Sequence, residues 1–457
     1  MRKDPNHQLA AVMAEAGASN KGLARRVREV AQRHGDHLGT THVAVQRWLD
    51  GGGIQRQTAG YVAEALGDKL RRRITPNDLG FPVAAPARMP VGTTLYGGSL
   101  AETLRTLETL THQRPEDGPG DELPLPESDV HSAALSWLVS RPDGLPTHAP
   151  AARRVGMRDV AAIRTAAGFF MQLDFQFGGG HAHKAFRHYF REDVLPLLSA
   201  SYSAKVGEAL FQAASEMSQL LAWSAYDSGN HALSGRYMMS TLRLTQIIGD
   251  RVMGARILTN MSHQANYLGQ ASRAVMLARA SVEGARATAT PRAMVLFSAH
   301  EARALSTSGD RKGAGRAMNE AERFFQSADS AEDPEWLAYM DEAELIGEFC
   351  HCFRDLGQGP DAVRFAERAV ELTDPKYART LGFCRMVLAQ SHLLDGDLEA
   401  AVATAGLAVE EGDALQSARF QRYVGDFQRE VSVHAHNPVV QQFNRDVQAA
   451  MQRLNDE

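Results

Sequence analysis

Five glycines recur along the second half of the chain at nearly constant spacing, and this repeat constrains the fold most. Gly229, Gly269, Gly309, Gly357 and Gly396 are separated by 40, 40, 48 and 39 residues. The sequence around them is rich in Ala, Leu, Arg and Glu and shows almost no strand-like alternation. Each glycine therefore predicts a turn between two helices. The repeat predicts stacked helix pairs, each burying its apolar face against the next.

Small residues occupy three fixed offsets from these glycines. The positions seven before, five after and twelve after each glycine are Ala222, Ser262, Ala302, Cys350 and Ala389; Ser234, Ala274, Ala314, Ala362 and Ala401; and Thr241, Ser281, Ala321, Ala369 and Ala408. Antiparallel helices that pack closely need a small side chain where each axis crosses its neighbour. This pattern resembles the tetratricopeptide repeat (TPR), whose consensus has small residues at the same offsets. The period exceeds the usual value of about 34 residues, so longer loops or helices are expected and the superhelical pitch stays open.

Composition divides the chain of 457 residues into three parts. Residues 151–457 form the expected TPR-like solenoid, which would serve in sensing and dimerisation. Residues 83–150 contain clusters of Pro, Gly and acidic residues, which predicts a linker because such a segment buries too little apolar surface to order itself. Two short helices are expected within it, near Ser99–His112 and Ser132–Val139. Residues 1–82 form a separate head, and the fold class is all-α.

The chain lacks the sequence features of secreted and membrane-spanning classes. Three cysteines are too few for a disulfide framework, and no apolar segment of a secretory signal follows Met1. No apolar run approaches the roughly 18 residues that a membrane helix needs. A cytoplasmic protein without membrane partners is therefore expected.

The head is basic although the whole chain has a net charge of -5. Residues 1–82 carry 13 Lys and Arg against 8 Asp and Glu, and the rest carries 36 against 46. A polyanion would therefore meet the head alone. Apolar periodicity and end signals predict four helices in the head, at His7–Ala16, Asn20–Gly35, Thr41–Asp50 and Gln57–Leu70.

The second and third of these helices have the pattern of a helix-turn-helix. Val45, Trp48 and Leu49 share one face of the third helix, which we expect in the core. The opposite face and the exposed N-terminal end would contact double-stranded DNA through Thr40, Thr41, His42, Val43, Gln46 and Arg47, with Asp50 beside them.

Each of these residue types suits a particular contact with DNA. Arg47 is the best candidate for bidentate bonds to guanine, and Val43 could pack on a thymine methyl group. Thr40 and Thr41, at a helix N-terminus, would bind phosphate. Lys21, Arg25, Arg26 and Arg28 on the preceding helix would add charge facing the DNA backbone.

The head resembles the Xre-type, lambda-repressor-like DNA-binding fold. The resemblance is carried by Leu23-Ala24 and by Val45-Gln-Arg-Trp-Leu-Asp-Gly51. Leu49 stands where that family often has Glu, and the run from Arg28 to Gly39 is longer than the usual turn, so the docking of the third helix stays open. The alternative is a helical cap on the solenoid that binds no DNA.

Head and body together resemble a group of Streptomyces regulators with an Xre-type head and a tetratricopeptide body. The motifs are Ser19-Asn-Lys-Gly-Leu-Ala-Arg-Arg-Val27, Arg47-Trp-Leu-Asp-Gly51, Phe177-Gly-Gly-Gly-His-Ala-His183, Ala222-Trp-Ser-Ala-Tyr-Asp227 and Met261-Ser-His-Gln-Ala-Asn-Tyr-Leu-Gly269. The resemblance implies a nucleoid-associated transcriptional regulator of development, sporulation or antibiotic production, without fixing activation or repression.

In the body, the first helix of each pair should line an inner surface. Counting from the turn glycines predicts a lining of Gln219, Trp223, Tyr226, His263, Asn266, Tyr267, Arg303, His351, Arg354 and Gln390. Aromatic anchors with amides and bases suit a peptide, a small polar molecule or a protein segment. The alternative is a solvated groove without a ligand. A homodimer is expected, through the helices after Leu415, including Val439 to Leu454.

No catalytic group, cofactor or metal is expected. His181 and His183 in Gly178-Gly-Gly-His-Ala-His183 are two residues apart, so a helix points them away from each other. Cys350 is a predicted core residue, and Gly309-Asp-Arg-Lys-Gly-Ala-Gly315 lacks the spacing of a phosphate loop. The alternatives to a DNA-binding regulator are a TPR scaffold that binds another protein without DNA, and an unrecognised enzyme.

Overall fold

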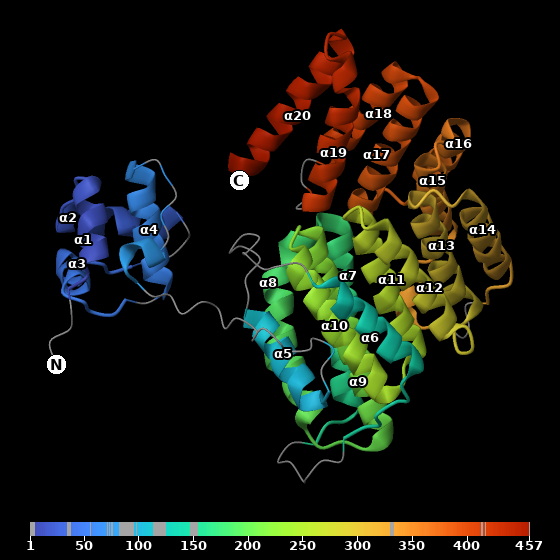
Figure 1. Ribbon diagram of the computed structural model, residues 1–457, viewed down its shortest axis with the longest axis horizontal. Helices are drawn as coiled ribbons and strands as arrows, with labels where there is room; N and C mark the ends of the chain where they lie inside the picture. The colour runs from blue at the N-terminus through green and yellow to red at the C-terminus, as the bar shows by residue number, and fades with distance from the viewer. Residues whose placement is uncertain are drawn as a thin grey trace. The chain divides into compact units, whose positions relative to one another are not determined.

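The computed structural model describes residues 5–33, 38–54, 56–70, 72, 74, 76–81, 96, 98–112, 125–146, 154–329, 333–412, 415 and 417–456. These residues are helical or irregular, and one isolated parallel bridge joins Arg154 and Ser201. The chain divides into two compact units, Met1–Gly92 and Thr93–Glu457 (Figure 1). The predicted all-α class is confirmed.

The first unit is a small bundle around one apolar core. Its helices are α1 (His7–Glu15), α2 (Asn20–Arg33), α3 (His42–Leu49) and α4 (Arg56–Leu70), followed by the 3-10 helix η1 (Pro76–Leu79). Leu23, Val27, Val45, Trp48 and Leu66 are among the side chains buried between them. All four helices predicted for the head are present, with ends within two residues of those expected.

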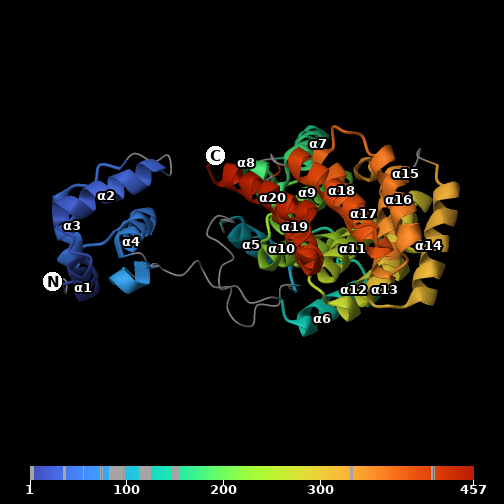
Figure 2. The same cartoon turned by 90° about the horizontal axis from the view of Figure 1, so that it is seen from above.

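Five helix pairs make up most of the second unit (Figures 1 and 2). They are α9 (Ala204–Asp227) with α10 (His231–Ile248), α11 (Arg251–Tyr267) with α12 (Ala271–Ala285), α13 (Pro291–Thr307) with α14 (Arg311–Gln326), α15 (Glu342–Asp355) with α16 (Gly359–Leu372), and α17 (Ala378–Asp395) with α18 (Leu398–Glu411). Each of the five repeated glycines lies in the turn inside one pair, with φ between 70° and 92°. This left-handed conformation ends a helix at little cost only for glycine.

The fifteen small residues counted from these glycines are all at most 1% exposed. Ser262 Oγ, for example, donates to the carbonyl of Ala274 across the α11–α12 contact at 2.8 Å. The prediction that small residues mark helix contacts is confirmed. The 48-residue interval contains an extra connection between α14 and α15, with the 3-10 helix η6 (Glu335–Leu337).

Helices on either side of the five pairs bring the two ends of the repeat together. The pairs are preceded by α7 (Met157–Phe177), α8 (Gly179–Tyr189), the π-helix η3 (Phe190–Val194) and the 3-10 helix η4 (Leu195–Ser199), and followed by α19 (Ala418–Val431), the 3-10 helix η7 (Ser432–His434) and α20 (Pro438–Asp456). The first helices of successive pairs pack side by side, α7 packs on both α9 and α17, and α19 packs on the same two helices.

The segment expected to be a linker contains two helices that belong to the second unit. They are α5 (Leu100–His112), which packs on α10, and α6 (Glu127–Val139), which packs on α10 and α12. Trp137 of α6 is fully buried, because Gly254 and Gly284 leave room for its ring. The two short helices predicted within this segment are therefore present, and they pack on the second unit, which composition alone does not show.

The late helices expected to form a dimer interface use their apolar residues within the chain. Phe420, Val424 and Phe427 of α19 and Val440 and Phe443 of α20 are at most 5% exposed and belong to one core with α17 and α18. These apolar faces are thus filled by the chain's own core, and the homodimer with its interface at these helices stays a prediction. Among the described helices, none combines the length and apolar character needed to cross a membrane.

Candidate functional site

The outer face of α3 is exposed as the head pattern predicts. Thr41, His42, Gln46 and Arg47 are exposed, and Val43 is 64% exposed although it is apolar. Val45 and Trp48 are buried on the opposite face, and Leu49 is half-buried against the same core. Thr41 caps the helix by accepting a bond from the Ala44 N–H at 3.4 Å.

Thr40 does not lie on this outer face. It is 7% exposed, and its carbonyl accepts a hydrogen bond from the Arg28 guanidinium. The Thr40 side chain therefore packs inside the unit, and Arg28 ties α2 to the chain just before α3; the phosphate contact predicted through the N–H groups at this helix start stays a prediction. The connection between α2 and α3 includes residues 34–37, which lie outside the described residues.

The remaining basic residues predicted on α2 differ in exposure. Lys21, Arg25 and Arg28 are exposed and Arg26 is half-buried, and Arg25 pairs with Glu29 on the same helix at 3.4 Å. Gln46 is held from two sides: its carbonyl oxygen accepts from the Asn20 amide at 2.9 Å, and its own amide donates to Asp50 at 3.0 Å. These bonds fix Gln46 relative to the start of α2.

The ten side chains predicted to line the inner surface are all buried or half-buried in the second unit, and several of them are in contact. The Tyr226 hydroxyl lies 3.1 Å from His263 Nδ1, and the Trp223 and Tyr267 rings pack edge-on against Tyr226. Counting from the turn glycines therefore indicates side chains that meet one another, and ligand binding by them stays a prediction.

Helix α19 covers part of this cluster, a feature that sequence reasoning missed. The Arg419 guanidinium lies 4.6 Å from the Tyr226 ring centroid and 5.2 Å from that of Trp223, while Arg422 lies 4.3 Å from that of Tyr267. Further along, the Tyr423 ring contacts His351, and Glu430 accepts from the Gln390 amide at 3.0 Å. Part of the cluster is thus a contact with α19, which the predicted inner surface did not include.

Charged and titratable groups in the cluster are strongly coupled. Arg303 donates from one nitrogen to both oxygens of Glu348, at 3.0 and 3.1 Å. Burial alone would raise the pKa of Glu348, but Arg303 and His300 hold it below its usual value. Burial, with the nearby Arg303, lowers the pKa of His263 and His351 well below the ordinary range. These two rings are therefore neutral at pH 7.

A second buried network joins the two ends of the repeat. Asp227, at the end of α9, is fully buried and accepts from the Gly179 N–H at 2.9 Å. Its other oxygen lies 3.4 Å from Arg379 and 3.5 Å from Arg419, and Arg379 also pairs with Asp174 at 2.9 Å. This network connects α7, α9, α17 and α19.

The Gly-Gly-Gly-His-Ala-His stretch has a packing role in the structure. A Cβ on Gly179 would lie 2.7 Å from the Ser224 carbonyl oxygen, so only glycine lets α8 approach α9 this closely. His183 is buried with Nδ1 2.8 Å from Ser224 Oγ, whereas His188 is exposed. The interpretation as a helix break with a new N-terminus fits these contacts.

His183 should make folding stability sensitive to acid. Burial, with the nearby Arg187, lowers its pKa to about 4, against about 6.5 in the unfolded chain. Between pH 6.5 and 4, His183 is protonated in the unfolded chain but stays neutral in the folded chain. The free energy of unfolding therefore falls as the pH drops from 6.5 towards 4. His183→Asn should remove about 2–3 kcal/mol of this fall, measured by urea unfolding at pH 7 and pH 4.5. Equal pH dependence in both proteins would contradict the assignment.

Comparison with known proteins gives one family match, within the first unit. Residues 9–82 match the family described as the SP15 N-terminal domain. No curated protein sequence matches the chain significantly.

Proposed function

We propose that the chain is a sequence-specific DNA-binding transcriptional regulator whose first unit reads double-stranded DNA through a helix-turn-helix formed by α2 and α3. The observation that supports this most is the outer face of α3, where Val43, Gln46 and Arg47 are exposed while Val45 and Trp48 hold the helix in the core. An exposed valine beside an arginine and an amide suits the edges of base pairs in the major groove.

The surroundings of Arg47 support the same role. The Gly52 N–H donates to the Arg47 carbonyl at 2.7 Å, and a Cβ on Gly52 would lie 2.6 Å from Arg47 Cγ. The turn after α3 therefore fixes the base of the Arg47 side chain. Lys21 and Arg25, exposed on α2, would contact phosphates.

The regulator would act as a homodimer on a two-fold operator, because one helix-turn-helix reads only a short half-site. Its effector would be a peptide, a small polar molecule or a protein segment that meets the inner cluster of the second unit. Since α19 covers Trp223, Tyr226 and Tyr267, such a ligand would have to displace α19. The resemblance to Streptomyces regulators makes development or secondary metabolism the proposed process.

Arg47→Ala should weaken specific binding and so lower the enrichment of the operator motif in a selection of genomic DNA fragments by the full-length protein at moderate salt. Loss of a bidentate contact with guanine costs about 1–3 kcal/mol, or roughly 5- to 150-fold in affinity. Arg72→Ala is the matched control, because Arg72 lies in the same unit and pairs with Glu15 at 2.7 Å. Wild type and control should enrich the same two-fold motif, and undiminished enrichment of that motif by Arg47→Ala would exclude this reading.

A protein scaffold that binds no DNA is the second candidate, favoured by the stacked helix pairs of the second unit. It predicts no fragment enrichment by any of the three proteins. It also predicts salt-tolerant capture of one protein partner, whereas DNA affinity should fall steeply with salt.

A further inference from the structure

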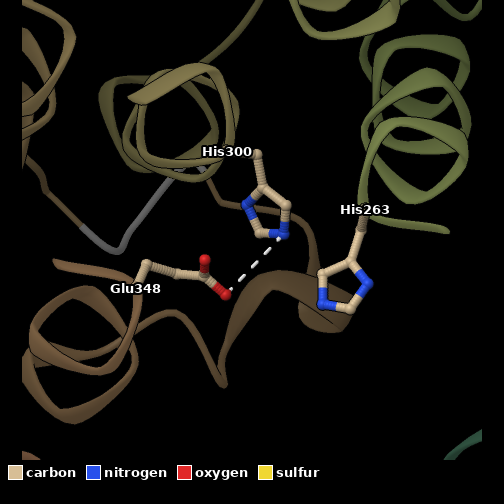
Figure 3. A group of neighbouring side chains, drawn as sticks. All are labelled: His263, His300 and Glu348. Atoms are coloured by element: carbon tan, nitrogen blue, oxygen red, sulfur yellow. Dashed lines mark ion pairs between the residues drawn. The ribbon is translucent and has the colours of Figure 1, made fainter. Parts of the chain in front are cut away.

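Three side chains on successive inner helices of the repeat point towards one position. His263 lies on α11, His300 on α13 and Glu348 on α15, and Figure 3 shows them facing one another. One ligand atom from each lies within 4.8 Å of the other two. His263, His300 and Glu348 are each 7% exposed, so bulk water has little access to their side chains.

Hydrogen bonds on the outer side of the group fix its inner atoms. His300 Nδ1 lies 3.0 Å from the Leu296 carbonyl, which can only accept, so Nδ1 carries the proton and Nε2 keeps its lone pair. This Nε2 lies 3.8 Å from Glu348 Oε1. On the other ring, Nδ1 lies 3.1 Å from the Tyr226 hydroxyl. If it donates to that oxygen, Nε2 of His263 also presents a lone pair.

Glu348 has a matching outer partner. Arg303 bonds to both carboxylate oxygens, so the group stays ionised inside the protein and is held in orientation. Metal-binding histidines typically donate their second N–H to a carbonyl or similar acceptor, and metal-binding carboxylates are themselves hydrogen-bonded. His300 and Glu348 have this arrangement, and His263 has it when its Nδ1 donates to the Tyr226 hydroxyl.

We propose that His263, His300 and Glu348 bind one divalent transition-metal ion of the zinc class, with a fourth position left for water or an anion. Two imidazoles and one carboxylate are a ligand set that zinc takes in proteins with an open position. Tetrahedral zinc places ligand atoms roughly 3.4 Å apart, so the three side chains close inward on the ion. The proposal departs from the expectation that the chain binds no metal.

The charge around the site favours an anion as the fourth ligand. The Arg303–Glu348 pair is neutral as a unit, so an added divalent ion would leave excess positive charge in a buried place. An anion at the fourth position lowers this excess, and a carboxylate or hydroxide has the right chemistry. The metal site depends on the second unit alone and does not rest on DNA binding.

The test uses full-length protein freed of metal with a chelator and then dialysed against Zn²⁺ or Co²⁺. We expect one Zn²⁺ per chain by elemental analysis, the visible absorption of a four-coordinate Co²⁺ centre, and a rise in Tm because metal binds the folded state. His300→Asn and His263→Asn should each weaken Co²⁺ binding by more than about 100-fold, beyond the roughly 10- to 100-fold that the loss of an outer partner costs.

His183→Asn is the matched control, because His183 is a buried histidine of the same unit outside the group. It should keep the Co²⁺ spectrum and the stoichiometry of the wild type. Circular dichroism of each variant without metal checks folding, and if His300→Asn fails to fold, Glu348→Gln takes its place. Absence of bound metal in the wild type, or an unchanged Co²⁺ spectrum in folded His300→Asn, would overturn the proposal.

Discussion

Asp227→Asn should destabilise the second unit by about 3–5 kcal/mol, the usual cost of removing one partner from a buried charge network. Asp227 is fully buried and lies beside two buried guanidiniums, those of Arg379 and Arg419. Asn keeps the shape and can still accept from the Gly179 N–H, but it cannot neutralise the arginines. Arg419 would lose its carboxylate while remaining among the Tyr226 and Phe383 rings.

Urea unfolding followed by tryptophan fluorescence measures this loss, since Trp137, Trp223 and Trp336 all lie in the second unit. Asp361→Asn provides the control. Asp361 pairs with Arg364 on the surface of α16 at 2.8 Å, and exposed pairs of this kind contribute about 0–1 kcal/mol. Similar losses in the two variants would show that the buried network adds nothing special to stability.

Trp137→Ala should cost about 3–5 kcal/mol, because a large buried aromatic side chain leaves a cavity. The ring is fully buried, and the Arg251 guanidinium lies 5.0 Å from its centroid. We expect α6 to become the most protease-sensitive helix of the second unit, measured by limited proteolysis together with urea unfolding. Leu135→Ala on the same helix is the control, since Leu135 is 60% exposed.

A second substitution separates the fit of this ring from a general loss of stability. A Cβ on Gly284 would lie 2.1 Å from the Trp137 ring, so Gly284→Ala should destabilise the wild type. The same change should cost much less in a Trp137→Ala background, where the clash is gone. Additive costs in the double variant would show that Gly284 and Trp137 do not share one packing site.

The repeat could be predicted because its signals are local. A glycine with positive φ and small residues at fixed offsets describe one helix pair without reference to any other part of the chain. The placement of α6 could not be predicted in this way, because Gly254 and Gly284, which receive Trp137, lie more than a hundred residues further along the sequence. The surroundings of Thr40 also involve another helix, since the Arg28 side chain donates to the Thr40 carbonyl.

Only part of the inner cluster could be predicted, because some of its residues lie outside the repeat. The repeat period indicates which residues face inward, but the covering residues Arg419 and Arg422 lie outside the repeat on α19. The sequence does contain a signal for His263, His300 and Glu348, but a search for short metal-binding motifs does not detect it. His300 and Glu348 both stand nine residues before their turn glycines, and His263 stands six before its own. Ligands brought together by repeats are separated by the repeat length, so short-spacing motifs do not find them.

The network at Asp227 also has a consequence for how the chain is made. Arg419 is 192 residues further along than Asp227, and ribosomes add about 5–20 residues per second. Arg419 is therefore synthesised on the order of 10–40 seconds after Asp227. Until then the first helix pairs hold an incompletely neutralised acid, so the growing chain reaches its full stability only after α19 has left the ribosome. A chain that stops before Arg419 would lack this partner of Asp227.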